Sequence, residues 1–308
     1  MDLQHRHTLE KFQVWVAAAG AACVAWFAAW PLVAPWDRGG PLAFAPTGDW
    51  ASLAMFAGVV VAMSSAVAVV TLSARPEGAL LAALAGVAGL AFRSGPMRTL
   101  LWRRADVPDR LFADLAIEMA AMAAVLAASA LAVACVRALL KRLLPRWAWS
   151  APTPAPGGRG APRPRTGGAQ AAMHMAGCLV MQMAIAMICL VHLFRSTDRG
   201  QIAFALAGSF LLGSLIAHQV FPIRATAVLW VGPLIMGMAV YGLGAAAAAG
   251  GANWRAVLMV GQGVPMRAAL PVDWLALGAG GAVGGFWISR RIHEARQAAE
   301  TAHPAQAT

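Results

Sequence analysis

The sequence has few charged residues. Asp, Glu, Lys and Arg together make up 12% of its 308 residues, against about 25% in an ordinary soluble domain. Hydrophobic residues make up 60% of the chain, and the charges lie in short islands between long apolar runs. This pattern excludes a soluble globular domain of ordinary composition and is typical of a multi-pass membrane protein.

The chain also lacks the short motifs of common enzymes. It contains no phosphate-binding Gly-x-x-x-x-Gly-Lys loop, no Gly-x-Ser-x-Gly elbow and no His-Glu-x-x-His metal motif. Its four cysteines form no Cys-x-x-Cys pair and no zinc spacing. We therefore expect no enzymatic activity and no resident cofactor.

A net charge of +11 could indicate a nucleic-acid-binding protein, but the sequence has no basic soluble domain that could hold a duplex. The arginines lie mainly at the ends of apolar runs, where they orient a membrane protein and contact anionic lipid. Arg far outnumbers Lys, and Ala and Gly are abundant, which is typical of a GC-rich bacterial genome. The expected surroundings are the lipid bilayer of a bacterial inner membrane, with no nucleic-acid partner.

Eight apolar runs are long enough, or nearly so, to cross the hydrocarbon core, which takes about 20 helical residues. The third run is the weakest, and a re-entrant helix is the alternative for it. Because more Arg and Lys fall on one set of connecting segments, we expect both ends of the chain in the cytoplasm. The predicted fold is all-α, a transmembrane bundle with eight spans at Phe12–Val33, Trp50–Leu72, Pro76–Phe92, Leu111–Val136, Ala171–Phe194, Ile202–His218, Ala225–Ala249 and Leu270–Ser289.

A basic segment rich in Pro and Gly divides the chain. Residues 136–149 alternate basic and bulky apolar side chains at helical spacing, so we expect them to continue the fourth span and to lie on the inner leaflet. Residues 150–170 have too few large apolar side chains to form a core, and we expect a disordered cytoplasmic linker there. The predicted halves are residues 1–149 and 171–308, with four spans each.

The two halves share a short pattern. Pro96-Met97-Arg98 precedes the fourth span and Pro265-Met266-Arg267 precedes the eighth, and an acid follows each tripeptide, at Asp114 and at Asp273. Because the tripeptides hold the same topological position, we expect an internal duplication. An even number of spans in each half makes the repeats parallel.

Ionisable residues inside a span are costly and are candidates for function. Glu118 lies about two turns inside the fourth span, and Asp114 lies one turn earlier on the same face. Two such acids could bind a cation or relay protons. We favour the alternative, a structural ion pair between Glu118 and an arginine of the preceding outer loop, Arg98 or Arg110, since an unpaired carboxylate in the membrane costs several kcal/mol.

Arg98 and Arg267 hold equivalent places in the presumed repeats. Each could reach an acid at the start of the next span, Asp114 for Arg98 and Asp273 for Arg267. One interpretation is an anion or lipid-headgroup site on the outer face. The interpretation that we favour is a pair of loop clasps.

The fifth span carries soft metal ligands on one helical stripe. Such side chains suit copper or haem iron, and a histidine at the inner end of the sixth span could join them. The competing interpretation is simple packing, because Met and Cys fit apolar interfaces well. The stripe and its candidate partner are His174, Cys178, Met181, Cys189, His192 and His218.

Small residues and one proline indicate how two later spans pack. Gly280-x-x-x-Gly284 and Gly281-x-x-x-Gly285 in the eighth span allow another helix to approach closely, within the chain or across a homodimer. Pro233 is expected to kink the seventh span. In a transporter such a break could expose carbonyl groups to an ion, although kinks are also tolerated for packing reasons.

Three functions are compatible with these features. A non-enzymatic scaffold or assembly factor that acts through membrane partners is favoured by the sparse buried polarity and the small-residue packing faces. A small-solute or ion transporter that uses Glu118 is favoured by the parallel repeats and Pro233. A haem or metal carrier would use the stripe in span five. A polar cavity that contains Glu118 would favour transport, whereas a sealed interior would favour the scaffold.

Overall fold

The computed structural model describes residues 3–37, 39–104, 106–145, 168–223, 226–250 and 265–302. Over these ranges the regular structure is entirely helical, as the sequence predicts, and seven helices are long and apolar enough to cross a membrane. The chain is therefore a multi-pass integral membrane protein. The seven are the helix made of α1 (Leu3–Val24), a π-helical turn (Ala25–Ala29) and α2 (Trp30–Val33), then α3 (Trp50–Val70), α4 (Pro76–Arg93), α6 (Pro108–Leu143), α7 (Gly168–Leu193), α8 (Arg199–Val220) and α9 (Ala227–Ala249).

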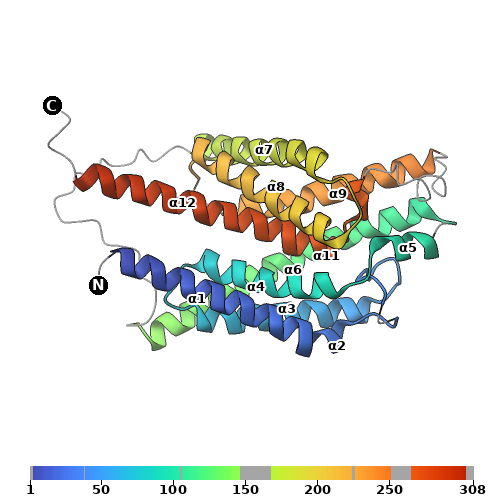
Figure 1. The fold of residues 1–308 in the computed structure, drawn as a ribbon, viewed down its shortest axis with the longest axis horizontal. Coiled ribbons are helices and arrows are strands. Elements are labelled where there is room, and N and C mark those ends of the chain that lie inside the picture. Colours follow the sequence, from blue (N-terminus) through green and yellow to red (C-terminus); the bar gives the residue numbers. More distant parts are fainter. Residues whose placement is uncertain are drawn as a thin grey trace.

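The eighth predicted span is divided. It begins with α11 (Pro271–Asp273), continues through a π-helical turn (Trp274–Gly278) and ends in α12 (Ala279–Ala302). Charged residues fill α12 from Arg290 onward, and this helix is not among the seven apolar ones. The predicted count of eight spans is thus not confirmed, although α12 runs along the bundle and reaches the end at which α1 begins (Figure 1).

Short helices close the opposite end of the bundle. They are α5 (Met97–Arg103), which follows α4, and the 3₁₀ turn Pro265–Ala268, which precedes α11. Both begin at the two similar tripeptides of the sequence. The predicted linker 150–170 lies almost wholly outside the described residues. The helical continuation of span four is confirmed as far as Leu143, where α6 ends.

The weakest predicted span is the most enclosed helix. α4 packs against α1, α3 and α12 and counts among the seven apolar helices. Its glycines explain both its low hydropathy and its position. A Cβ atom on Gly89 would lie 2.8 Å from the carbonyl oxygen of Ala22, and one on Gly78 would lie 2.6 Å from a methyl group of Val14. Small residues therefore let α1 lie directly on α4.

One hydrophobic core extends across both halves of the chain. In Figure 1, α1, α3 and α4 lie on one side of the bundle and α7, α8 and α12 on the other, while α6 packs against α9 and so joins the halves. Large side chains fill the interior, and the fully buried ones include Trp274, Tyr241, Phe56, Phe112, Phe210 and Phe286.

The helices of the two halves pack in different orders. α1 packs mainly on α4, whereas its counterpart α7 packs mainly on α8. α3 and α4 are neighbours, but α8 makes few contacts with α9. The predicted duplication is therefore not confirmed by the helix packing.

The glycine pairs of the eighth predicted span pack inside the chain. A Cβ atom on Gly281 or Gly285 would lie 2.3 Å or 2.2 Å from a backbone oxygen of α8. Gly280 and Gly284 face leucine side chains, the nearest of them on α4. The sequence left open whether these glycines contact a helix of the same chain or of a second copy. In the structure they contact helices of the same chain.

Candidate functional site

Glu118 lies in the interior and holds a loop in place. Its side chain is fully buried on α6, and Oε2 accepts hydrogen bonds from the backbone N–H groups of Phe44 (2.8 Å) and Ala45 (3.0 Å). The predicted ion pair with Arg98 or Arg110 is wrong, because both arginines are exposed and neither pairs with Glu118. Backbone amides bind one oxygen of the carboxylate instead.

The loop that Glu118 holds folds back into the bundle. We call residues 40–47 the buried loop, since Leu42 and Phe44 have 0% and 3% of their surface exposed. A buried loop has no helix or strand to satisfy its N–H groups, so side chains must accept those hydrogen bonds. Ser94 Oγ accepts one from Leu42 at 2.8 Å, and Glu118 accepts two. No pattern in the sequence predicts that this loop is buried, because its residues resemble an ordinary connection.

Close backbone contact fixes the buried loop on its other side. Gly95 donates its N–H to the carbonyl oxygen of Gly40 at 2.9 Å, and a Cβ atom on Gly95 would lie 2.1 Å from the oxygen of Gly39. Arg103 hydrogen-bonds Asp37 at the surface and lowers the pKa of that carboxyl group.

Asp114 was the second acid predicted on the same helix face as Glu118. In the structure its side chain is half-buried.

Asp273 also has a structural role, with a partner other than the predicted one. Its carboxylate is 1% exposed and accepts hydrogen bonds from Arg199 Nη1 (2.8 Å) and from the backbone N–H of Leu270 (2.7 Å). Arg199 also donates to the carbonyl oxygen of Ala91 on α4. Arg199 of α8, and not the predicted Arg267, therefore pairs with Asp273. The guanidinium group of Arg267 lies over the ring of Phe112.

A group of buried and half-buried charges lies at the end of the bundle where α1 begins. We call it the charged cluster, and it contains three acids and three arginines. Glu10 Oε2 lies 3.0 Å from Arg291 Nη2, and Glu77 Oε1 lies 2.7 Å from Arg290 Nη1. Its members are Glu10, Arg75, Glu77, Arg290, Arg291 and Glu294.

The charged cluster joins the two halves of the chain. Glu10, Arg75 and Glu77 come from α1 and the start of α4, and each pairs with a residue of α12. Sequence reasoning missed this cluster because its members flank the apolar runs, where charges normally meet water. The packing of α1 and α12 against α4 buries Glu10, Arg75 and Glu77.

The soft ligands predicted on α7 lie in several different surroundings. Among the described residues no three His, Cys, Asp or Glu side chains are close enough to hold a metal ion. Cys178 and Met181 pack in an apolar cluster with α8 and α9, and His192 is exposed. His174 packs against the ring of Phe221. His218 contacts Ser289 Oγ at 2.8 Å and the carbonyl oxygen of Ile223 at 3.2 Å.

A buried glutamine compensates for the proline of α9. Pro233 has no N–H, so the carbonyl oxygen of Leu229, four residues earlier, loses its helical partner. Gln182 on α7 is fully buried, and its Nε2 donates to that oxygen at 2.8 Å and to Ser214 Oγ at 2.8 Å. The proline therefore does not open a site for an ion here, because a neighbouring helix occupies the freed carbonyl group.

This pairing predicts a coupled effect of two substitutions. Gln182→Leu should lower the free energy of unfolding by about 1 kcal/mol, the usual scale of such bonds in membranes. In a Pro233→Ala background the new N–H can bond Leu229, so Gln182→Leu should then cost clearly less. Unfolding of the four proteins in mixed detergent micelles measures the coupling energy. If the changes in unfolding free energy add within about 0.5 kcal/mol, Gln182 does not compensate for the N–H group that Pro233 lacks.

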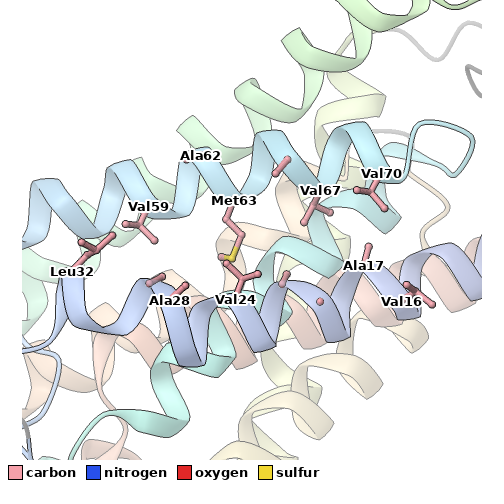
Figure 2. Close-up of a pocket in the computed structure, with 14 residues that line it drawn as sticks. Val16, Ala17, Val24, Ala28, Leu32, Val59, Ala62, Met63, Val67 and Val70 are labelled. Atoms are coloured by element: carbon pink, nitrogen blue, oxygen red, sulfur yellow. The ribbon is translucent and has the colours of Figure 1, made fainter.

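Two surface grooves stand out, and none of the candidate residues lines either of them. The first, of about 530 Å³, lies between α1 and α3 and has only apolar side chains and glycine in its walls (Figure 2). The second, of about 450 Å³, lies between the ends of α8 and α12 and is lined by Leu215, Ile216, Gln219, Val220, Ile292 and Arg296. Glu118 thus lies in a packed interior and not in either groove.

The chain matches no protein-family model, and neither the curated proteins nor the solved structures contain a significant match to it. The site geometry is therefore the basis for any functional conclusion.

Proposed function

We propose that this protein is a non-catalytic scaffold or assembly factor of the bacterial inner membrane, with both ends of the chain in the cytoplasm. It acts through contacts between its surface and other membrane components. It does not move a solute through its interior.

The main observation behind this proposal is that the two halves are tied together at both ends. The charged cluster links α12 to α1 and α4 at one end. At the other end Arg199 links Asp273 to the carbonyl oxygen of Ala91. A transporter that rocks one half against the other must separate such contacts in turn.

The use of Glu118 supports the same proposal. A carboxylate that binds a transported cation needs free acceptor positions facing a water-filled path. Oε2 of Glu118 already accepts two backbone hydrogen bonds, and the side chain is fully buried. One observation favours the transporter as a second candidate: Oε1 of Glu118 is buried, and no group among the described residues donates to it.

Complementation of a deletion strain separates the two candidates. Glu118→Gln keeps an oxygen for both amide donors but removes the negative charge, so a scaffold should restore the strain as well as the wild-type protein does. Asp114→Asn, one turn away and half-buried, is the matched control. Loss of complementation by Glu118→Gln alone, at normal abundance and stability, would overturn the scaffold proposal.

Flux measurements give a second, independent reading. The purified wild-type protein in liposomes that contain pH-sensitive and potassium-sensitive dyes should give the same leak as protein-free liposomes. A flux that the wild type supports and Glu118→Gln abolishes would establish the transporter instead.

A further inference from the structure

A chain of hydrogen bonds joins the end of α8 to α12, and the two helices pack side by side (Figure 1). Ser289 on α12 is fully buried, and His218 on α8 is 5% exposed. Ser289 Oγ lies 2.8 Å from Nδ1 of His218 and 2.8 Å from Nε2 of Gln219. The other ring nitrogen of His218, Nε2, lies 3.2 Å from the carbonyl oxygen of Ile223. We call these four residues the polar junction.

The partners of His218 determine which of its nitrogens carries hydrogen. A carbonyl oxygen can only accept, so Nε2 carries the hydrogen and donates it to Ile223. In a neutral ring Nδ1 then carries none, and it accepts the hydroxyl hydrogen of Ser289. Ser289 Oγ accepts in turn from the amide of Gln219. All three hydrogen bonds therefore run in one direction, and they fit a neutral His218.

A second proton on the ring would conflict with this arrangement. A protonated imidazole can only donate, so the hydroxyl hydrogen of Ser289 would have to leave Nδ1 and find another acceptor. The positive charge would also lie in the interior, where a charge without a counter-ion is costly. Among the described residues no carboxylate lies within ion-pair distance of His218. The polar junction is thus built for an uncharged ring.

The charged and titratable groups that face His218 from α12 do not offset this cost. The ring centre of His293 lies 5.4 Å from that of His218, and the guanidinium group of Arg290 is close enough to act on the ring electrostatically. Glu77 and Glu294 pair with Arg290 and cancel part of its charge. A further positive charge beside these basic groups is still unfavourable.

The other neighbours of His218 cannot balance a charge either. The ring of Phe286 on α12 meets the ring of His218 edge to face, with 4.6 Å between the ring centres. Cys178 on α7 belongs to the same apolar cluster as Phe286, and His174 on α7 contacts Phe221. Apolar side chains and a thiol offer a charged ring neither a counter-ion nor a strong hydrogen bond.

A groove gives the polar junction a route to the surroundings of the protein. Gln219 lines the groove of about 450 Å³ between the ends of α8 and α12, and it also donates to Ser289. Arg296 lines the same groove and is exposed. Arginines near the ends of membrane helices extend to the lipid headgroups and water. A small separation of the two helices at Gln219 would therefore hydrate the polar junction.

We propose that the polar junction is a proton-sensitive contact, which holds the end of α8 on α12 at neutral pH and releases it when His218 takes up a proton from the groove. Water then becomes the partner of the charged ring. Arg290 and Arg291 on the same segment of α12 pair with acids of α4 and α1, so that side of the segment stays in place while the α8 side separates. Such a contact responds to acid whether or not the protein is a scaffold.

The dependence of stability on pH tests this proposal. A histidine of the unfolded chain takes up a proton near about pH 6.5, whereas the closed junction excludes it, so unfolding binds a proton and becomes more favourable as the pH falls. Through His218, the unfolding equilibrium constant in mixed micelles should rise by up to about tenfold for each pH unit below that value. His218→Gln keeps a donor and an acceptor but cannot be protonated, so its constant should rise less by that factor. The acids of the charged cluster are present in both proteins, and their effects cancel in the ratio.

Two further histidine variants show whether the effect belongs to His218. His192→Gln is the matched control, because it removes an exposed imidazole, and it should keep the wild-type dependence on pH. His293→Gln removes the neighbouring ring and should keep it as well. Parallel curves for the wild type and His218→Gln, or a loss of the dependence in His293→Gln alone, would overturn the proposal.

Distances between spin labels show where the molecule opens, and they need no substitution at His218. In a background with the four native cysteines replaced by alanine, one pair of labels occupies Val220 on α8 and Ala295 on α12, which are both exposed. Their separation should increase between about pH 7.5 and about pH 5.5, on either side of the pH at which free histidine titrates. The control pair, at Lys11 on α1 and Ala295, spans the charged cluster and should keep its distance. An unchanged distance between Val220 and Ala295, or an equal change in both pairs, would refute the proposed contact.

Discussion

Glu10→Ala should lower the free energy of unfolding by about 3–5 kcal/mol, the usual cost of removing one partner from a buried ion pair. Glu10 is 6% exposed, and its two oxygens face Arg75 at 3.6 Å and Arg291 at 3.0 Å. Without the carboxylate, the charged cluster holds three arginines against two acids. The side chains of Arg75 and Arg291 are only 4% and 13% exposed, so water cannot easily take the place of Glu10.

Unfolding by sodium dodecyl sulfate in mixed micelles, followed by tryptophan fluorescence, measures this effect. Lys11→Ala is the matched control, since Lys11 is the next residue and is exposed. It should change the unfolding free energy by no more than about 0.5 kcal/mol. The double variant Glu10→Ala/Arg291→Ala should cost less than the sum of the single variants, because it removes a buried charge together with its partner. Equal effects of Glu10→Ala and Lys11→Ala would show that the cluster adds nothing to stability.

Glu118→Ala should also have a large effect, about 2–6 kcal/mol. The substitution leaves the N–H groups of Phe44 and Ala45 without an acceptor in the interior, and each such loss costs about 1–3 kcal/mol. Glu118→Gln keeps an acceptor oxygen in the same place and should cost at most about 1.5 kcal/mol. Glu118→Leu, which fills a similar volume without an acceptor oxygen, should cost more than Glu118→Gln, whereas a merely packing role would make these two variants similar.

Hydrogen exchange locates the effect within the chain. In Glu118→Ala the amides of residues 42–45 should exchange faster, while those of α7 and α8 should be unchanged. Asp114→Ala, four residues earlier and half-buried, should leave the exchange of the buried loop as it is in the wild type. Protection of Phe44 and Ala45 in Glu118→Ala would mean that another group holds the loop.

The sequence predicted the helices well, because span length and apolar character are local properties. The run Trp50–Leu72 became α3 at Trp50–Val70, and Pro76–Phe92 became α4 at Pro76–Arg93. It was also predictable that the Glu118 side chain points into the bundle, since a carboxylate that faces lipid without a partner is too costly. These predictions needed only the period of the helix and the cost of an unpaired charge.

The partners of the buried charges were not predictable in the same way. Glu118 meets amides from a loop more than 70 residues away, and Asp273 meets Arg199, which is 74 residues away. The sequence offered nearer arginines for both acids, and proximity along the chain proved a poor guide. The charged cluster was missed for a related reason, since its residues acquire partners only through the packing of α12.

The charged cluster also has a consequence for how the protein is made. Glu10, Arg75 and Glu77 are synthesised more than 200 residues before their partners Arg290, Arg291 and Glu294. During that interval Glu10 and Arg75 can already contact each other, whereas the partners that α12 provides for them and for Glu77 do not yet exist. The C-terminal helix thus completes the molecule in time as well as in space, because the ion pairs that join the two halves at this end form only after it has been synthesised.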